Sequence, residues 1–326
     1  MTVALSTFLL SLVLTGAAAW YARSTGLMAI PDVRSSHASA IPSGGGLGIV
    51  LTWLLVSVGM LGEAAPAFWL IGVLPGALAL AVVGWIDDHR SLPARLRFAV
   101  QLAVSLYLLG FSWHLGLLDS APWLAVALLW LLWIANLYNF MDGSHGMAGT
   151  QGVFAGLVLA WLFHRSGAHG MALVSLMIAA SCLGFLPWNL ARSRVFMGDV
   201  ASVPLGFALA GLCAYGVATG AFPATAALLV LAVFMVDASL TLLGRMLRGE
   251  RWYTPHRQHL YQRLIVSGWS HESVLALYLS INITLVLPAI VVTVRNPEPT
   301  WFLTPGLIAM MIVGWILAIR RLGVTA

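Results

Sequence analysis

The sequence predicts an all-α, polytopic integral membrane protein, and three observations support this fold class. Hydrophobic residues make up 60% of the 326 residues and charged residues only 8%, whereas soluble domains carry roughly 25% charged residues. The mean hydropathy is +0.94. At about 20 residues per membrane-spanning helix, the chain has room for about ten helices and short loops. We therefore expect residues 1–326 to form a single transmembrane domain without a large soluble domain.

Apolar runs predict about eleven transmembrane helices. The first run also resembles a signal peptide near Ala17–Ala19, but it lacks a preceding basic segment, so we expect a membrane helix there. An odd number of helices places the two termini on opposite sides. The predicted helices cover residues 3–20, 46–62, 67–86, 97–116, 122–141, 146–163, 170–188, 200–217, 223–244, 273–294 and 300–319.

The arginines predict the orientation of the chain. All sixteen basic residues are arginine, so Schiff-base chemistry and a Walker-type lysine are excluded. A periplasmic N-terminus and a cytoplasmic C-terminus leave only Arg165 and Arg295 outside, as the positive-inside rule favours. Because the arginines are scattered between apolar runs, we attribute the net charge of +5 to membrane topology and expect no nucleic-acid partner.

The acidic residues gather at the same predicted cytoplasmic face, mostly at helix ends. Carboxylates in such positions indicate a metal and phosphate site at the inner interface, whereas a proton relay would place them across the bilayer. Three acidic residues, Glu63, Asp119 and Glu298, fall in outside loops. The inner-face set comprises Asp32, Asp87, Asp88, Asp142, Asp199 and Glu250, with Asp237 in the inward half of the ninth helix.

Two inner loops come first in the chain, 21–45 and 87–96. In loop 21–45, Arg34 and His37 stand three residues apart, and Gly44–Gly46 lead into a helix. The glycine amides could face an anion, or the glycines could permit a turn and a close helix approach. In loop 87–96, Asp87 and Asp88 point about 100° apart on a helix, so one of the two faces any given ligand.

The segment 136–146 resembles a phosphate or nucleotide site at a membrane surface. It follows a long apolar run and places several polar side chains within a short distance. Asn136 and Asn139 are neighbours on one helix face, and Asp142 follows where Gly143 and Gly146 permit a turn.

The two remaining inner loops, 189–199 and 245–272, carry further polar side chains. Asn189, Arg194 and Asp199 lie close together before a helix. His256 and His259 share one face if the later loop is helical, but the pair lacks the glutamate and spacing of a zinc protease. Phosphate contact or helix packing is the favoured interpretation of these histidines.

Two non-enzymatic alternatives are weighed against a catalytic site. A secondary transporter of a lipid-linked or anionic solute would carry polar groups near the midplane in two repeated halves, and the sequence has no internal repeat. A scaffold protein would not require four aspartates, at 87, 88, 142 and 199, on one side.

Five ordered segments carry a family resemblance: Arg-x-x-His with Pro-x-Gly-Gly, Asp-Asp, Asn-x-x-Asn-Phe-Met-Asp-Gly, Phe-Met-Gly-Asp and His-x-x-His. Together, over residues 31–263, they resemble the polyprenyl-phosphate N-acetylhexosamine-1-phosphate transferases, glycosyltransferase family 4. The loop from Pro255 to Arg263 resembles the branch that initiates O-antigen synthesis with N-acetylglucosamine, N-acetylfucosamine or N-acetylquinovosamine phosphates. The phospho-MurNAc-pentapeptide translocase is a more distant relative.

The resemblance implies an enzyme that transfers N-acetylhexosamine-1-phosphate from a UDP-sugar to undecaprenyl phosphate, releasing UMP. It implies a bacterial inner-membrane location, a role in O-antigen, lipopolysaccharide or related cell-envelope glycan synthesis, and Mg²⁺ as cofactor, with Mn²⁺ as an alternative. The sugar and the oligomeric state stay open, a homodimer being one alternative. If the family's functional residues are transferred to the matching motif positions, the resemblance implies that Asp87, Asp88 and Asp199 are catalytic, with Asp199 and Asp87 as metal ligands. The implied substrate-binding residues are Arg34, His37, Asn136, Asn139, Asp142, Asn189, Arg194, His256, Arg257 and His259.

The chain departs from the family pattern at two positions. His145 stands where the family often has the second aspartate of Asp-Gly-x-Asp-Gly, and Ala201 replaces the glycine of Gly-Asp-x-Gly-Ser. The role of His145 stays open. Asp237 either supports the catalytic site or pairs with nearby Arg245, and we favour support.

Overall fold

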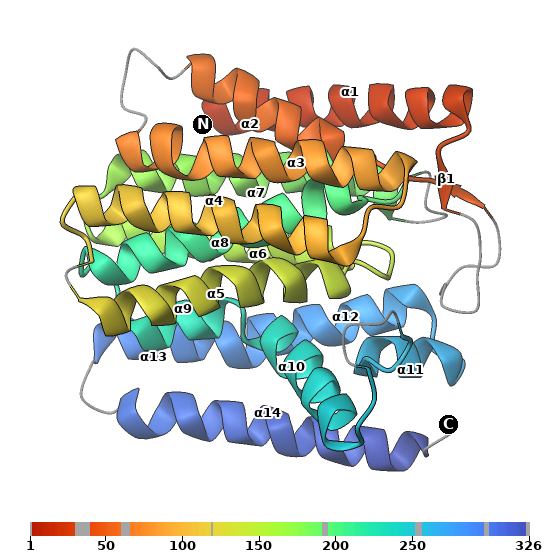
Figure 1. Ribbon diagram of the computed structural model, residues 1–326. Helices are drawn as coiled ribbons and strands as arrows, with labels where there is room; N and C mark the ends of the chain where they lie inside the picture. The colour runs from red at the N-terminus through yellow and green to blue at the C-terminus, as the bar shows by residue number, and fades with distance from the viewer. Residues whose placement is uncertain are drawn as a thin grey trace.

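A computed structural model describes residues 2–29, 40–59, 66–118, 120–190, 195–251, 256–296 and 300–323. Its long helices run side by side, most of them along one common direction (Figure 1). The helices of the first half are α1 (Thr2–Thr25), α2 (Leu47–Gly59), the π-helix η1 (Phe68–Val73) with α3 (Leu74–His89), α4 (Ala94–His114), α5 (Ala121–Phe140) and α6 (Met147–Arg165). A two-residue antiparallel pair, β1 (Met28–Ala29) and β2 (Ile41–Pro42), joins α1 to α2.

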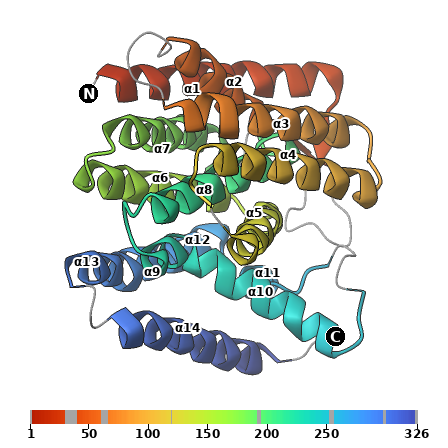
Figure 2. The same ribbon diagram turned by 60° about the vertical axis from the view of Figure 1, so that its left-hand side comes forward.

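The second half continues the bundle and adds a short helix in the last inner loop. Its helices are α7 (His169–Asn189), α8 (Asp199–Ala218), α9 (Ala224–Val230), α10 (Ala232–Leu247), α11 (Leu260–Val266), α12 (His271–Ile281), the π-helix η2 (Asn282–Val286), α13 (Leu287–Arg295) and α14 (Thr300–Leu322). α14 lies at the edge of the bundle in both views (Figures 1 and 2).

The described residues contain 9 helices that are long and apolar enough to cross a membrane. The bent pair α9 and α10 adds one more, and α2 is a shorter apolar helix. The prediction of an all-α polytopic membrane protein is confirmed, and every predicted run contains a helix. How many of these helices cross the membrane, and in which direction, stays a prediction.

The ninth predicted helix is broken. α9 and α10 meet at a bend of 76°, where the sequence predicts one continuous helix over 223–244. A break leaves backbone carbonyls without helical partners, which is costly inside a membrane. Here the side chain of Gln151, on α6, donates from Nε2 to the carbonyl of Val230 at 3.0 Å, and this bond stabilises the break.

α8 forms the centre of the bundle and packs closely against its neighbours through glycines. A Cβ atom added at Gly84 of α3 would lie 2.3 Å from the carbonyl oxygen of Asp199. One added at Gly206 of α8 would lie 2.7 Å from the Cβ atom of Tyr138 on α5. Because these glycines let the backbones approach, as in other membrane helix pairs, the ends of α3 and α5 meet the start of α8.

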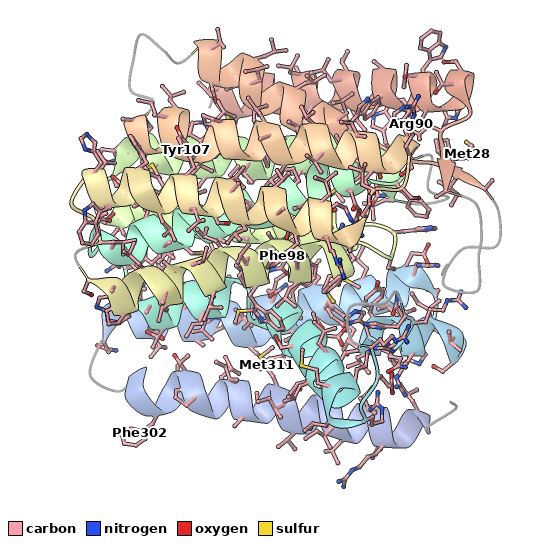
Figure 3. The ribbon with its side chains drawn as sticks, viewed as in Figure 1. Met28, Arg90, Phe98, Tyr107, Phe302 and Met311 are labelled. Atoms are coloured by element: carbon pink, nitrogen blue, oxygen red, sulfur yellow. The ribbon has the colours of Figure 1, made fainter. Side chains whose placement is uncertain are left out.

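The aspartate-bearing helix ends lie at one end of the bundle. α1, α3, α5 and α7 finish at this end, and α8 begins there (Figure 1). Figure 3 shows Met28 and Arg90 at the same end, whereas Phe302 lies at the other. The polar loops that the sequence assigned to one membrane face therefore share one end of the molecule.

Asp237 holds the last inner loop against the bundle. Asp237 lies on α10 and is 2% exposed, and its carboxylate accepts hydrogen bonds from α11, α12 and α14. This supports the interpretation of Asp237 as a support for the site, and Arg245 forms an ion pair with Glu250 at 2.8 Å. The donors to Asp237 are the backbone N–H groups of Leu260 (2.7 Å) and Tyr261 (3.3 Å), Tyr278 Oη (2.6 Å), Trp315 Nε1 (3.0 Å) and Thr241 Oγ1 (3.4 Å).

Replacing Asp237 by alanine should lower the melting temperature in detergent by about 5 °C or more, because several buried donors lose their acceptor. Ser280→Ala is the matched control, since Ser280 is exposed and its hydroxyl donates to the carbonyl of Leu277 in its own helix. Equal melting temperatures for the two variants would contradict this role of Asp237.

Candidate active site

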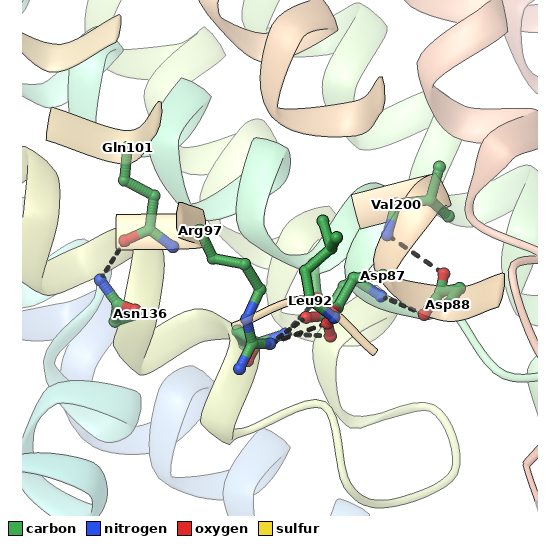
Figure 4. A network of polar contacts seen from close by, with 10 residues as sticks. Asp87, Asp88, Leu92, Arg97, Gln101, Asn136 and Val200 are labelled. Carbon is green, nitrogen blue, oxygen red and sulfur yellow. Dashed lines mark hydrogen bonds and ion pairs between the residues drawn. The ribbon is translucent and has the colours of Figure 1, made fainter. Parts of the chain in front are cut away.

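Arg97 joins the ends of two helices by binding two aspartates at once. From the first turn of α4, its Nη1 atom donates to Asp87 Oδ2 at 2.8 Å and to Asp199 Oδ2 at 3.0 Å. Asp87 Oδ1 accepts from the backbone N–H of Leu92 at 2.6 Å. Figure 4 shows the guanidinium of Arg97 directed towards Asp87. Arg97 is a site residue that the sequence interpretation missed, since it was assigned only to topology.

Asp88 binds different groups from those that Asp87 binds. Its two carboxylate oxygens accept from the backbone N–H groups of Asp199 (3.2 Å) and Val200 (3.4 Å), the first residues of α8. A carboxylate at a helix N-terminus satisfies free N–H groups and complements the helix dipole. The divergence expected for adjacent helix positions is therefore present: Asp88 binds the backbone of α8 and Asp87 binds Arg97.

Gly198 makes this arrangement sterically possible. Its φ is +78°, in the left-handed region, and a Cβ atom there would lie 2.4 Å from Asp88 Oδ2. Only glycine adopts such a backbone readily without a clash. The Phe-Met-Gly-Asp segment thus sets Asp199 at the first position of α8.

Asn139 and Asp142 complete one wall of the cluster. Asn139 Nδ2 donates to Asp199 Oδ1 at 2.7 Å and to Ser202 Oγ at 2.8 Å. Burial raises the pKa of Asp142 well above its usual range, and the nearby charges of Asp199 and Asp88 raise it further, against a backbone hydrogen bond from Gly198. The structure therefore brings four predicted aspartates and Asn139 into one cluster.

This aspartate cluster, residues 87, 88, 142 and 199, gathers four carboxyl groups around the start of α8. Arg97 is its cationic partner among the described residues. Within those residues no group of three or more His, Cys, Asp or Glu side chains converges on one point, and the guanidinium lies between Asp87 and Asp199. Oxygen-only donors of this kind suit a hard cation such as Mg²⁺.

The other two predicted asparagines lie beside the cluster and bind protein atoms. Asn136 Nδ2 donates to Gln101 Oε1 and to the carbonyl of Leu132, both at 2.7 Å. Asn189 is 3% exposed; its Oδ1 accepts from the N–H of Gly146 at 2.6 Å and its Nδ2 donates to the carbonyl of Val195 at 2.9 Å. Asn189 therefore ties the loop after α5 to the loop before α8.

The glycine-rich loop pairs with the segment before α8. The N–H groups of Gly45 and Gly46 donate to the carbonyls of Phe196 (2.8 Å) and Met197 (3.0 Å). A Cβ atom on Gly46 would lie 2.3 Å from that of Ala201, so this glycine accommodates the alanine that departs from the family pattern. These contacts favour the close-approach interpretation of the glycines. Three predicted substrate-binding residues, Arg34, His37 and Arg194, lie outside the described residues.

The histidine loop packs against the end of α5. The rings of His256 and His259 are 4.8 Å apart, and His259 stacks near Phe140, at the end of α5, with ring centres 6.2 Å apart. His259 is 2% exposed, and burial lowers its pKa. Arg257 is partly buried in the same loop. The ring of His259 packs against those of Phe140, His256 and Tyr261, so the structure gives it a packing environment.

His145 packs against the start of α12. Its ring stacks on that of His271, with ring centres 4.2 Å apart and planes 9° from parallel. Ser144 Oγ shares a hydrogen bond with His271 Nδ1 at 2.9 Å. The position where the family has an aspartate is thus part of an imidazole pair beside the site.

The fold and the aspartate cluster define a polytopic membrane protein with a polar site at one end. A family model described as glycosyl transferase family 4 matches residues 70–217. The decaprenyl-phosphate N-acetylglucosaminephosphotransferase of Mycolicibacterium smegmatis is 31% identical over 301 residues, 79% of this chain and 73% of that protein.

Two further relatives agree with this match. The decaprenyl-phosphate N-acetylglucosaminephosphotransferase of Mycobacterium tuberculosis is 29% identical over 351 residues, 95% of this chain and 86% of that protein. A phospho-N-acetylmuramoyl-pentapeptide-transferase of Synechococcus is 30% identical over 273 residues, 78% of this chain and 79% of that protein. The chain belongs to glycosyl transferase family 4, and it is a sugar-phosphate transferase.

Replacing Gly198 by alanine should lower the melting temperature, because the added Cβ atom meets Asp88 and the left-handed backbone costs about 1–2 kcal/mol. Gly167→Ala is the matched control: Gly167 has a φ of +79° with no atom within 4 Å of the added Cβ. Equal losses in the two variants would show that the contact with Asp88 carries no cost.

His256 should make the protein less stable in mild acid. Burial, with the charges of His259 and Arg245, lowers the pKa of His256 from 6.5 to about 3. The unfolded chain therefore binds this proton more readily, and the free energy of unfolding falls as the pH drops below about 6.5. We expect the melting temperature to fall less steeply in His256→Gln than in wild type. An unchanged slope in His256→Gln, matching that of exposed His114→Gln, would contradict this expectation.

Proposed function

We propose that this protein transfers an N-acetylhexosamine-1-phosphate group from a UDP-sugar to undecaprenyl phosphate, with release of UMP. The single observation that carries the proposal is the aspartate cluster, which gathers helix ends from α3, α5 and α8 at one end of a membrane bundle. The names of the similar proteins support a polyprenyl phosphate acceptor and an N-acetylated sugar.

The proposal implies that the site lies at the inner surface of the bacterial cytoplasmic membrane. The arginine distribution supports that orientation, and a UDP-sugar and the phosphate of a membrane-anchored lipid can meet only at a membrane surface. The N-acetylglucosamine, N-acetylfucosamine and N-acetylquinovosamine donors remain candidates, in O-antigen or related glycan synthesis.

As cofactor of the aspartate cluster we propose Mg²⁺, with Mn²⁺ as an alternative, because carboxylate oxygens suit a hard cation. Asp87 and Asp199 are the residues that would hold it, because their Oδ2 atoms already share a cationic partner, Arg97. The bound ion would supply charge neutralisation between two anionic substrates. Asp88 is committed to the N-terminus of α8, which favours a positioning role for it.

The chemistry that we propose is direct displacement at phosphorus. An oxygen of undecaprenyl phosphate forms a bond to the β-phosphorus of the UDP-sugar, and the bond from that phosphorus to the bridging oxygen breaks. The bridging oxygen and the electron pair leave with UMP. Because a phosphate monoester has a second pKa near 6, the acceptor is mostly dianionic at neutral pH, so no side chain has to remove a proton.

The residues of the chain then act mainly by orientation. Asn139 fixes one oxygen of Asp199 and leaves the other toward Arg97. Asp87 is fixed from the other side by the N–H of Leu92. Such pre-organisation of charges accounts for much of the rate enhancement in phosphoryl transfer.

Reconstituted protein should convert radiolabelled UDP-N-acetyl sugars and undecaprenyl phosphate into labelled lipid and UMP in the presence of Mg²⁺. A panel of N-acetylated donors identifies the sugar. If every donor fails to give a labelled lipid, and an Asp199→Asn variant still complements cells, the proposal is contradicted. A trapped aspartyl-phosphosugar would contradict direct displacement while leaving the overall transfer intact.

Arg97→Gln should lower kcat for sugar-phosphate transfer about 100-fold, because the two carboxylates lose the group that positions them. Arg97→Lys keeps the positive charge, and its kcat should be about tenfold higher than that of Arg97→Gln. Arg95→Gln is the matched control, because Arg95 lies one half-turn earlier on α4 and is exposed. Equal rates in the Arg97 and Arg95 variants would remove Arg97 from the site.

A further inference from the structure

Tyr261 connects the last inner loop to the segment that carries Asp142. It lies on α11 and is 0% exposed, and α11 lies beside α5 (Figure 2). The Tyr261 hydroxyl donates to the carbonyl of Phe140, the last residue of α5, at 3.1 Å. Phe140 stands between Asn139 and Asp142 in the sequence. The tyrosine therefore contacts the segment that brings two polar side chains to the aspartate cluster.

The carbonyl of Phe140 is one that its own helix does not satisfy. The last four carbonyls of a helix lack the N–H groups of a following turn. The N–H of Asp142 reaches back to the carbonyl of Asn139, at 3.1 Å. The Tyr261 hydroxyl thus binds α5 at the point where the chain leaves the helix, and it fixes the direction in which residues 141–143 continue.

Gly143 allows the hydroxyl to lie close to this turn. A Cβ atom added at Gly143 would overlap Tyr261 Oη, whereas the next ring atom, Cζ, would lie 3.2 Å from it. Gly143 lies outside the left-handed region. An alanine at this position would therefore introduce the overlap without backbone strain.

Asp237 fixes Tyr261 from the other side. Its Oδ2 atom accepts from the N–H of Tyr261 at 3.3 Å, and its Oδ1 atom accepts from that of Leu260 at 2.7 Å. The first turn of α11 is thereby bound to α10. The tyrosine ring is held against the end of α5 by a backbone that is itself anchored.

The position of the turn decides where Asn139 and Asp142 lie. Asn139 Nδ2 donates to Asp199 Oδ1 at 2.7 Å. Burial and the charges of Asp199 and Asp88 raise the pKa of Asp142, so its carboxyl group lies near theirs. Because hydrogen bonds weaken steeply when their geometry changes, a small movement at the end of α5 would alter both contacts.

We propose that Tyr261 is a positioning residue of the active site, whose hydroxyl holds the end of α5 so that Asn139 and Asp142 are oriented to bind the donor substrate. The inference rests on the proposed function for the identity of that donor, a UDP-sugar. Tyr261 acts through the turn at residues 140–143 and does not touch the substrate. Through this contact the last inner loop sets the geometry of the site.

Hydrogen–deuterium exchange tests the contact without any substrate. In Tyr261→Phe the amides of residues 139–146 should exchange about fivefold faster than in wild type, because the turn loses a hydrogen bond, while those of α13 are unchanged. Tyr107→Phe is the matched control: Tyr107 Oη donates to the carbonyl of Ile71 at 2.6 Å, toward the other end of the bundle from Arg90 (Figure 3). Equal exchange of residues 139–146 in Tyr261→Phe and wild type would overturn the proposal.

Steady-state kinetics test the effect on the reaction. In Tyr261→Phe the KM for the UDP-sugar should rise about fivefold, as loss of one neutral hydrogen bond predicts, and the KM for undecaprenyl phosphate should stay within about twofold of wild type. Partial unfolding would lower the rate and leave both KM values unchanged, so an unchanged donor KM would overturn the proposal. If wild type transfers no sugar, the proposed function alone is contradicted, and the exchange experiment still decides the role of Tyr261.

Gly143→Ala tests the same contact from the opposite side. Its donor KM should also rise, because the added Cβ atom displaces the Tyr261 hydroxyl. In the double variant with Tyr261→Phe the overlapping oxygen is gone, so the donor KM should match that of Tyr261→Phe alone. Independent sites have additive free-energy effects, so a double variant in which the two increases multiply would contradict the contact.

Discussion

One guanidinium, that of Arg97, binds two of the four clustered aspartates where α3, α4 and α8 meet. Burying charge is costly unless an opposite charge or hydrogen bonds compensate. Arg97 forms ion pairs with Asp87 and Asp199, backbone N–H groups bind Asp88, and burial raises the pKa of Asp142. Close glycine contacts between α3 and α8 bring these groups together, so the packing of the bundle and the charge of the site depend on each other.

Asp237 is a buried carboxylate that, unlike Asp87 and Asp199, is stabilised by neutral hydrogen-bond donors. Asp237 is surrounded by neutral donors from several helices, and these donors satisfy the carboxylate without a cation. Such a group stabilises one conformation of the last inner loop. The contrast separates a structural aspartate from the aspartates at positions 87 and 199, where the hydrogen bonds are fewer and a cation takes their place. Asp237 lies within its apolar run, whereas Asp87 and Asp199 lie at the ends of theirs, but composition does not show which of these aspartates binds a cation.

Much of the fold followed from hydropathy and arginine placement, since membrane helices are specified by length and apolar content. The bend between α9 and α10 was missed because it depends on Gln151, which is distant in sequence and satisfies the freed carbonyl of Val230. The structure places the four aspartates of the motifs close together, and their roles stay a prediction. The sequence did not show that Asp87 and Asp88 bind different partners, or that Arg97 binds both Asp87 and Asp199. These contacts depend on how α3, α4 and α8 pack together, and local sequence carries no information on that packing.

The central claim, that the aspartate cluster is a divalent-cation site, is tested most directly by electron paramagnetic resonance with Mn²⁺ as the probe. Purified wild-type protein should hold one Mn²⁺ ion whose signal broadens when UDP is added, through coupling to its phosphorus nuclei. The Asp87→Asn, Asp199→Asn double variant should lose that ion, whereas Asp237→Asn should retain it. The same bound Mn²⁺ signal in the double variant and in wild type would contradict the account.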